Sequence, residues 1–267
     1  MGEVLSDDPI LSSSTQDRRK AIGESVTWSK LISGLYYPNA RSIENGIDSL
    51  KPWMASIKGF LNSQKLPIFW IDGRSGEGKS VLLLQLAHAI ATINQDVEYY
   101  HSVRPNSLLP LIEHVNAHTN NDLMKIFVVD DLHKIENYRD FDIIIDAYIN
   151  NSNMQFAIIT CGPTLEKEIF ERNVRNSLIH SYNPTSWTQY DRNSLGEWFD
   201  LTVPKTAKDQ DQLLIETLYE MKEGKALSAF ALSFKTRLEE LGVFEPISTA
   251  LCANRLTISL HSQLLIT

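Results

Sequence analysis

The stretch IFWIDGRSGEGKSVLLLQL, at residues 68–86, constrains the fold more than any other part of the chain. It begins with a continuous apolar run, which is typical of a strand buried on both faces of a parallel sheet. A glycine-rich turn follows, and residues 80–92 are then apolar on nearly every side, as expected of a buried helix. The stretch therefore predicts a strand, a tight loop and a helix in succession, which is how a βαβ unit begins.

The turn GRSGEGKS fits the phosphate-loop pattern G-x-x-x-x-G-K-[ST] at every specified position. Its glycines allow successive N–H groups to point inward at an anion, and the positive end of the next helix adds to that field. We expect Lys79 to reach the β- and γ-phosphates of a nucleotide and the Ser80 hydroxyl to bind Mg²⁺. The residues predicted to bind the nucleotide here are Gly73, Arg74, Ser75, Gly76, Glu77, Gly78, Lys79, Ser80 and Val81.

A second apolar run, KIFVVDD at residues 125–131, ends in two consecutive carboxylates. We expect Asp130 to hold Mg²⁺ through water, because Mg²⁺ keeps much of its hydration shell. Asp131 has two interpretations, which the sequence leaves open. It either polarises the attacking water as a general base, or it merely caps the next helix or faces solvent. His133, which follows, is expected at the surface without a catalytic role.

A further strand, expected in MQFAIITCGP at residues 154–163, carries Thr160 near its end. A polar side chain at the tip of a strand beside Asp130 is well placed to sense the γ-phosphate, so Thr160 is a candidate catalytic residue together with Lys79 and Asp131. The alternative is that Thr is simply a common strand residue.

The rest of the chain alternates between strand and helix patterns, with another strand expected at 97–103. Helices are expected at 43–61, 107–119, 140–150 and 165–172, and Pro52 would kink the first of them or begin a second helix. This alternation predicts an α/β fold with a mostly parallel sheet between helices, and ligands on such sheets bind beyond the carboxyl ends of the strands. Together with the loop motif, it predicts a P-loop NTPase core. Three later helices, at 191–201, 210–223 and 226–241, predict a small helical domain after that core.

The expected organisation has five parts. They are a mobile polar arm (1–25), a helical segment contacting the nucleotide site (26–66), the α/β core (67–185), a helical lid (186–245) and the start of a further segment or linker (246–267).

Composition limits the partners and the compartment. The formal net charge of −8 does not favour nucleic acid as a partner, because domains that bind it are generally basic. Cys161 and Cys252 form no disulfide or zinc pattern, so we expect a cytoplasmic protein. No signal peptide and no apolar run near the roughly 18 residues of a membrane helix is present, so no membrane partner is expected.

These motifs resemble those of the STAND class of P-loop NTPases, the signal-transduction ATPases with numerous domains that are related to AAA+ proteins. The likeness rests on the loop at 73–80, the pair Asp130 and Asp131, the strand FAIITCGP and the helical segment after the core. Upstream, ARSIENGIDSL resembles the class element G-R-x-x-E-x-x-x-L, with Ala40 where the class usually has Gly. The resemblance implies that Arg41 and Glu44 lie near the base and ribose of the nucleotide.

In that class the nucleotide is a conformational latch, with ADP holding a closed monomer and ATP permitting oligomerisation. The resemblance therefore implies an ATP-binding and slowly ATP-hydrolysing regulatory switch, with ATP or ADP and Mg²⁺ as cofactors. Self-association or a larger multidomain assembly is the implied partnership. Many bacterial relatives serve in antiviral defence, so that role is implied as well.

Two other functions remain open on the sequence. One is an AAA+-type ATPase acting on DNA as a ring, which needs basic pore residues and an arginine supplied by a neighbour. The other is a nucleotide-binding module that does not hydrolyse its ligand.

Overall fold

The computed structural model describes most of the α/β region and the first helices that follow it. The described residues are 3–4, 8–62, 65–92, 97–102, 124–134, 138, 141–142, 156–174, 176–203, 213–224, 235–236, 239–240, 242 and 245. The helix expected at 107–119 lies outside this set, as do most of the helices expected at 140–150 and 226–241 and the final segment at 246–267.

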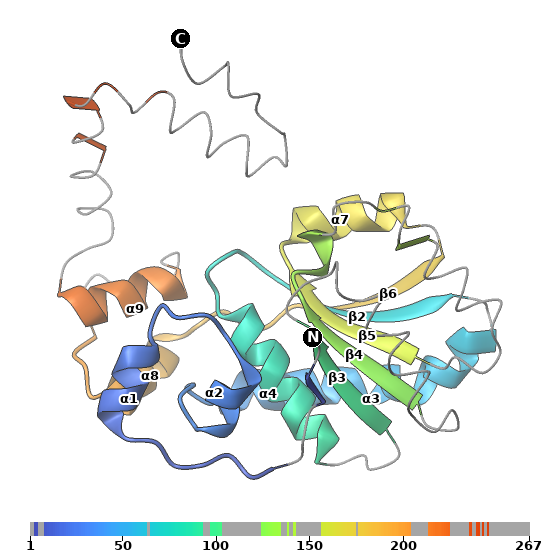
Figure 1. The fold of residues 1–267 in the computed structure, drawn as a ribbon, viewed down its shortest axis with the longest axis horizontal. Coiled ribbons are helices and arrows are strands. Elements are labelled where there is room, and N and C mark those ends of the chain that lie inside the picture. The colour runs from blue at the N-terminus through green and yellow to red at the C-terminus, as the bar shows by residue number, and fades with distance from the viewer. Residues whose placement is uncertain are drawn as a thin grey trace.

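A six-stranded sheet in the order β1-β3-β4-β5-β2-β6 forms the centre of the fold (Figure 1). The short strand β1 is antiparallel to β3, and all other neighbours are parallel. The predicted α/β class with a mostly parallel sheet is thus confirmed. The strands are β1 (Glu3–Val4), β2 (Leu66–Asp72), β3 (Val97–Ser102), β4 (Met124–Asp130), β5 (Phe156–Gly162) and β6 (Ser177–Tyr182).

Strands β2 and β5 are buried along their whole length, because both faces of the sheet are covered. Phe69 and Ile71 face one core, formed with α2 (Trp28–Ile32), α3 (Ala40–Asn62) and α4 (Lys79–Ala91). Ile68 and Trp70 face a second core on the opposite side, where α7 (Thr164–Asn173) and the short 3₁₀ helix η2 (Leu132–Lys134) pack. This alternation explains why the apolar runs in the sequence are continuous.

Helix α3 continues through Pro52 as one helix, so a second helix beginning at that residue is not what forms. Proline leaves the carbonyl of Asp48 without its helical donor. Both Pro52 and Asp48 are exposed, so water can reach this part of the helix, while Leu50 and Trp53 keep their neighbouring turn in the core.

A third cluster lies beside the sheet and consists of α1 (Thr15–Ala21), α8 (Gln189–Phe199) and α9 (Leu214–Glu223). Figure 1 shows these three helices together, on the side of α4 away from the strands. We call them the helical cluster. Its helices α8 and α9 are the first two that the sequence predicts after the core.

Helix α1 differs from the mobile arm expected for residues 1–25. It is held by two arginines rather than by a large apolar face. Arg19 Nε donates to the carbonyl oxygen of Phe199 at 2.7 Å, and the Arg18 guanidinium lies 3.7 Å from the centre of the Trp198 ring. A polar sequence can therefore form part of the fold, because its charged side chains bind a segment about 180 residues away.

No helix within the described ranges is both long and apolar enough to cross a lipid bilayer.

Candidate functional site

The loop between β2 and α4 has a backbone that glycine favours strongly. Gly73, Gly76 and Gly78 have φ of 150°, 86° and 79°, values that residues with a Cβ rarely adopt. Gly78 is also the residue that precedes the first turn of α4. The predicted glycine pattern therefore coincides with three left-handed backbone positions between the carboxyl end of a buried strand and the start of a buried helix.

A buried ion pair fixes the point where the loop leaves the sheet. Asp72, the last residue of β2, accepts hydrogen bonds from Thr164 Oγ1 at 2.7 Å and from Lys167 Nζ at 3.0 Å. Both donors come from α7, so each oxygen of this carboxylate accepts a hydrogen bond from the helix on the other face of the sheet from α4. Asp72 is thus a structural anchor for the loop rather than a ligand for an incoming group.

Lys79 is the first residue of α4 and lies buried beneath the loop. Its Nζ donates to the carbonyl oxygen of Arg74 at 2.7 Å. Burial lowers the pKa of Lys79, although nearby acidic groups act in the opposite direction. No carboxylate of the described residues forms an ion pair with Lys79. An anion bound in the loop would therefore supply the negative charge that neutralises this ammonium.

Ser80 and Asp130 are hydrogen-bonded to each other even though fifty residues separate them in sequence. The hydroxyl Oγ of Ser80 donates to Asp130 Oδ1 at 3.0 Å, which brings the first turn of α4 to the carboxyl end of β4. The loop and the predicted metal-binding carboxylate are therefore parts of one site.

Cys161 is a member of this site that the sequence reading missed. It pairs with Asp130 in the register of β4 and β5, and its Sγ donates to the same Oδ1 at 3.0 Å. Burial, followed by the charge of Asp130, raises the pKa of this thiol well above its usual value. Strand alternation could have indicated Cys161, because the residue that pairs with Asp130 on the neighbouring strand faces the same side of the sheet.

Thr160, the neighbouring residue, faces the other way. Its side chain is fully buried, and Oγ1 accepts a hydrogen bond from the backbone N–H of Leu132 at 3.3 Å. Leu132 belongs to the core on the α7 side of the sheet, whereas Cys161 belongs to the core on the α4 side. The structure thus does not bring the Thr160 hydroxyl to the phosphate loop, and its predicted sensing role would need a rearrangement.

Asp131 has a left-handed backbone with φ of 52°, which is uncommon for a residue other than glycine. Its carboxylate pairs with Lys134 and lies 3.9 Å from His133 Nε2. Of the two interpretations of Asp131, this arrangement matches a residue that stabilises the next turn.

His133 was expected at the surface, but only 9% of its side chain is exposed. Its ring packs near Trp70 and against the backbone of Gly162, and its Nδ1 has no hydrogen-bond partner. Burial lowers the pKa of His133, with Asp131 acting in the opposite direction. The turn after β4 folds back onto the sheet, which is why a polar ring is buried there.

The other predicted nucleotide-binding residues lie in two places. Arg74 and Glu77 pair with each other at 2.9 Å on the exposed side of the loop. Arg41, at the start of α3, is directed to the helical cluster, where its Nη2 binds Asp191 at 2.7 Å and the carbonyl oxygen of Ser186 at 2.9 Å. Contact of Arg41 with a base or ribose stays a prediction.

The start of α9 lies directly on the loop. The backbone N–H of Ile215 donates to the carbonyl oxygen of Gly76 at 3.0 Å. A Cβ at Gly76 would come within 2.7 Å of Ile215 Cγ2, and one at Gly78 within 3.0 Å of Leu214 Cδ2. The helical cluster thus touches the segment that would hold phosphate groups, and it packs against its glycines.

Ser80 and Asp130 are suitable donors for Mg²⁺, because a hydroxyl and a carboxylate are the hard oxygen ligands that this ion prefers. The Ser80 proton points to Asp130, so the lone pairs of its oxygen stay available. The described residues contain no group of three or more His, Cys, Asp or Glu side chains arranged to hold a metal. Mg²⁺ commonly takes only one or two protein carboxylates and fills its shell with phosphates and water.

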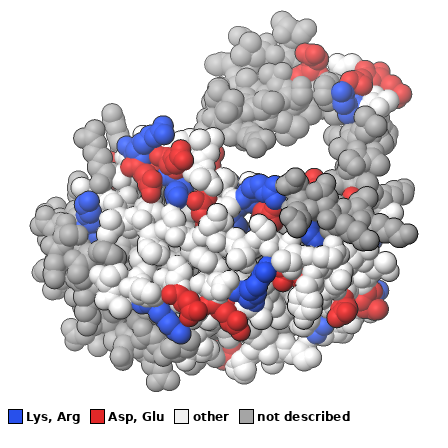
Figure 2. Space-filling model, turned by 180° about the vertical axis from the view of Figure 1, so that it is seen from behind, with Lys and Arg blue, Asp and Glu red and all other residues white. Residues whose placement is uncertain are grey.

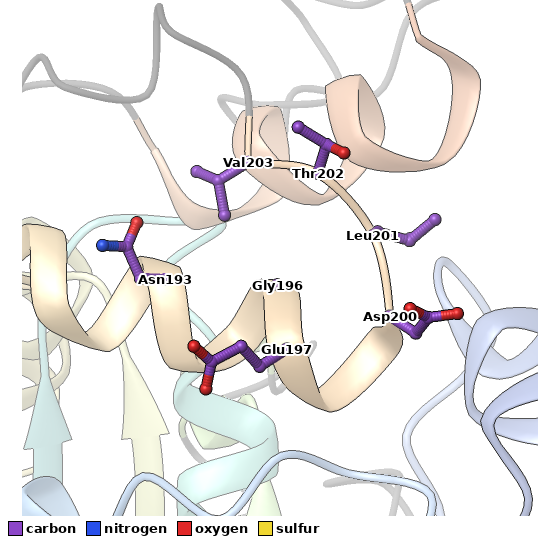
Figure 3. Close-up of a pocket in the computed structure, with 7 residues that line it drawn as sticks. All are labelled: Asn193, Gly196, Glu197, Asp200, Leu201, Thr202 and Val203. Atoms are coloured by element: carbon purple, nitrogen blue, oxygen red, sulfur yellow. The ribbon is translucent and has the colours of Figure 1, made fainter.

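Two pockets lie away from the loop. One, of about 430 Å³, is formed by the C-terminal half of α8 and residues 200–203, and the other, of about 560 Å³, separates α4 from the segment at 10–12. Figure 3 shows that the carboxylates of Glu197 and Asp200 in the first pocket point apart.

On the face in Figure 2, described acidic and basic side chains are mixed rather than gathered in one basic patch.

Comparison with protein-family models and with curated proteins found no match to this chain. A crystal structure of Saccharomyces cerevisiae RIF2 is similar at 14% identity, over 74% of this chain and 77% of that chain, with a TM-score of 0.36. A likeness of this size carries no argument about function.

Proposed function

We propose that this chain is a P-loop NTPase of the STAND type that binds ATP or ADP with Mg²⁺ and uses the nucleotide as a regulatory switch. The observation that carries the proposal is the hydrogen bond of 3.0 Å between Ser80 Oγ and Asp130 Oδ1. It supports the proposal because it joins the two residues proposed to bind Mg²⁺, beside a loop whose three glycines are left-handed. Two motifs that are fifty residues apart in the sequence thus lie side by side in the fold, which supports a shared ligand.

The loop residues would bind the phosphates. The loop lies at the N-terminus of α4, where backbone N–H groups and the helix dipole favour anions. Lys79 would exchange its hydrogen bond with the Arg74 carbonyl for phosphate oxygens, which relieves the burial of an unneutralised ammonium. Mg²⁺ held by Ser80 and Asp130 would neutralise charge on the phosphates.

Control of conformation would pass through α9. Phosphates in the loop must be accommodated next to Ile215 and Leu214, which now pack on Gly76 and Gly78. The position of the helical cluster and the occupancy of the loop are therefore linked, and each should shift the other. Self-association follows if the cluster exposes a new surface when it moves. The proposed compartment is the cytoplasm, because a reducing compartment suits the free thiol of Cys161.

A second candidate is a module that binds nucleotide without hydrolysing it. It is favoured by the position of Asp131, whose carboxylate is bound by Lys134, and by Thr160, whose hydroxyl is occupied by the Leu132 N–H. Neither side chain is directed to an attacking water in this arrangement. Slow hydrolysis in the first proposal would require Asp131 to leave Lys134.

Binding is tested with a fluorescent ATP analogue, whose anisotropy is followed with and without Mg²⁺. We expect wild-type protein to bind in both conditions and more tightly with Mg²⁺, and Ser80→Ala to lose most of the Mg²⁺-dependent gain. Ser33→Ala, a substitution at an exposed serine, is the control. If wild-type protein binds equally with and without Mg²⁺, the metal role of Ser80 and Asp130 is wrong.

The switch is tested by size-exclusion chromatography with light scattering in ADP and in a non-hydrolysable ATP analogue. A change of mass or of elution volume between the two nucleotides is the expected result. Identical behaviour in both would favour the module without switching.

A further inference from the structure

We propose that Cys161 is a positioning residue that orients the carboxylate of Asp130 for Mg²⁺ in the phosphate-loop site. This inference rests on the proposed function of the site and assigns a task to a side chain that no motif includes. The expectation from the sequence was that β5 contributes Thr160, one residue earlier.

The register of the sheet explains why β5 contributes a thiol. Asp130 pairs with Cys161 and Val129 pairs with Thr160 in the parallel ladder. Side chains of paired residues face the same side of a sheet, so Cys161 shares the face of Asp130 and α4, while Thr160 shares the face of Val129 and Leu132. A one-residue shift of register would exchange these roles.

Two donors converge on one oxygen of Asp130. Ser80 Oγ and Cys161 Sγ both lie 3.0 Å from Oδ1. Ser80 approaches from the first turn of α4 and Cys161 from the adjacent strand, so the carboxylate is held between two elements of the core. Neither contact uses Oδ2, which accepts no hydrogen bond from the described residues, and together they fix the direction in which it points.

Fixing a carboxylate before the ion arrives favours metal binding, because less side-chain freedom is lost on binding. Cys161 is 1% exposed and does not need to touch the ion to have this effect. The thiol keeps its proton and acts through Asp130. Its removal should therefore weaken the response to Mg²⁺ while leaving the affinity for nucleotide without metal unchanged.

The alternative is that Cys161 only fills space in the core, as buried thiols often do. Three variants separate the two roles. Cys161→Ser keeps a donor, Cys161→Ala removes it with a small loss of volume, and Cys161→Val removes it with a small gain of volume. A space-filling role ranks the variants by size, whereas a positioning role groups serine with the wild-type cysteine.

The test titrates Mg²⁺ against protein with a bound fluorescent ATP analogue and, separately, measures affinity for the analogue in EDTA. For Cys161→Ala and Cys161→Val we expect the half-saturating Mg²⁺ concentration to rise about three- to tenfold, the range for loss of one ordinary hydrogen bond, because a thiol is a weak donor. Cys161→Ser should stay within about twofold of wild type, and affinity in EDTA should be the same for all four proteins. Thermal unfolding of each variant shows that the compared proteins are folded.

The outcomes distinguish the inference from the function on which it rests. If wild-type protein binds the analogue with an Mg²⁺ response and the two non-donor variants match it, Cys161 is a packing residue and the inference is wrong. If affinity in EDTA falls along with the Mg²⁺ response, the effect is a general loss of the site, which also contradicts it. If wild-type protein binds no analogue in either condition, the proposed function fails and this inference fails with it.

Discussion

The two ends of the candidate site differ in how completely they are built. At the loop, three left-handed glycines, a buried Lys79 and the hydrogen-bonded pair of Ser80 and Asp130 lie close together, and the proposed function assigns them to phosphates and Mg²⁺. At the tips of β4 and β5, two side chains with expected catalytic roles are occupied. Asp131, the candidate general base, pairs with Lys134, and Thr160, the candidate γ-phosphate sensor, accepts the Leu132 N–H. In the proposed function, binding therefore needs no rearrangement of these residues, while hydrolysis needs a change at the turn after β4.

The largest expected effect concerns the binding end. Replacing Lys79 with Ala should weaken ATP binding about 30- to 100-fold, because hydrogen bonds to charged groups contribute about 1.5–3 kcal/mol and this ammonium is buried. Fluorescence anisotropy with the ATP analogue measures the change. Lys51→Ala, an exposed lysine on α3, is the matched control and should bind normally. Equal affinity of the two variants would remove Lys79 from the site.

The next effect tests the conformation of the loop. Gly76→Ala should lower the free energy of unfolding by about 1–2 kcal/mol for the left-handed backbone, with a further loss from the contact with Ile215. Gly23→Ala is a matched control, because its φ is 84° and a Cβ there meets nothing within 4 Å. Chemical denaturation measures both. A cost for Gly76→Ala no larger than that for Gly23→Ala would mean that α9 does not press on the loop.

The hydrolysis end can be examined through Lys134. The pair with Asp131 is partly exposed and contributes about 0.2–1 kcal/mol, so Lys134→Ala should raise ATP turnover about two- to fivefold if Asp131 is the general base. Phosphate release assays measure the rate. The gain should disappear in Lys134→Ala combined with Asp131→Asn. Turnover that persists in the double variant would exclude Asp131 as the base, and no turnover in any protein would favour the module without hydrolysis.

The smallest effect is a pH dependence at the same turn. Because burial lowers the pKa of His133, the unfolded chain takes up a proton below about pH 6.5 that the folded chain resists. Stability from neutral His133 is fully present above pH 6.5 and is lost as the pH falls from there toward the lower folded pKa, by up to about 1 kcal/mol at pH 5.5. Denaturation at pH 7.5 and 5.5 measures the loss, which should be smaller in His133→Gln. The same loss in both proteins would show that other groups cause it.

The sequence predicts most of the central sheet because β2, β4 and β5 are buried on both faces and read as continuous apolar runs. It does not predict β6, an edge strand with the partly exposed residues SLIHSY, which lack such a run. Helix α1 was missed for a different reason. Its main contacts are from Arg18 and Arg19 to α8, and charged residues without an apolar pattern give no local sign of tertiary packing.

The candidate site shows the same limit. The loop and Asp130 could be found because each has a local pattern, and the fold brings them together as expected. Whether Thr160 or Cys161 faces Asp130 depends on strand register, which neighbouring residues in one sequence do not define. The orientation of Asp131 depends on a left-handed residue and on the Lys134 pair, neither of which any motif encodes.

The most direct measurement of the central claim is a calorimetric titration of the wild-type protein with ATP in saturating Mg²⁺, repeated with Asp130→Asn. The account predicts one nucleotide bound per chain, with clearly weaker binding in the variant because the Ser80 and Asp130 pair is disrupted. Absence of binding heat together with unchanged thermal stability of the wild-type protein at millimolar ATP would contradict it.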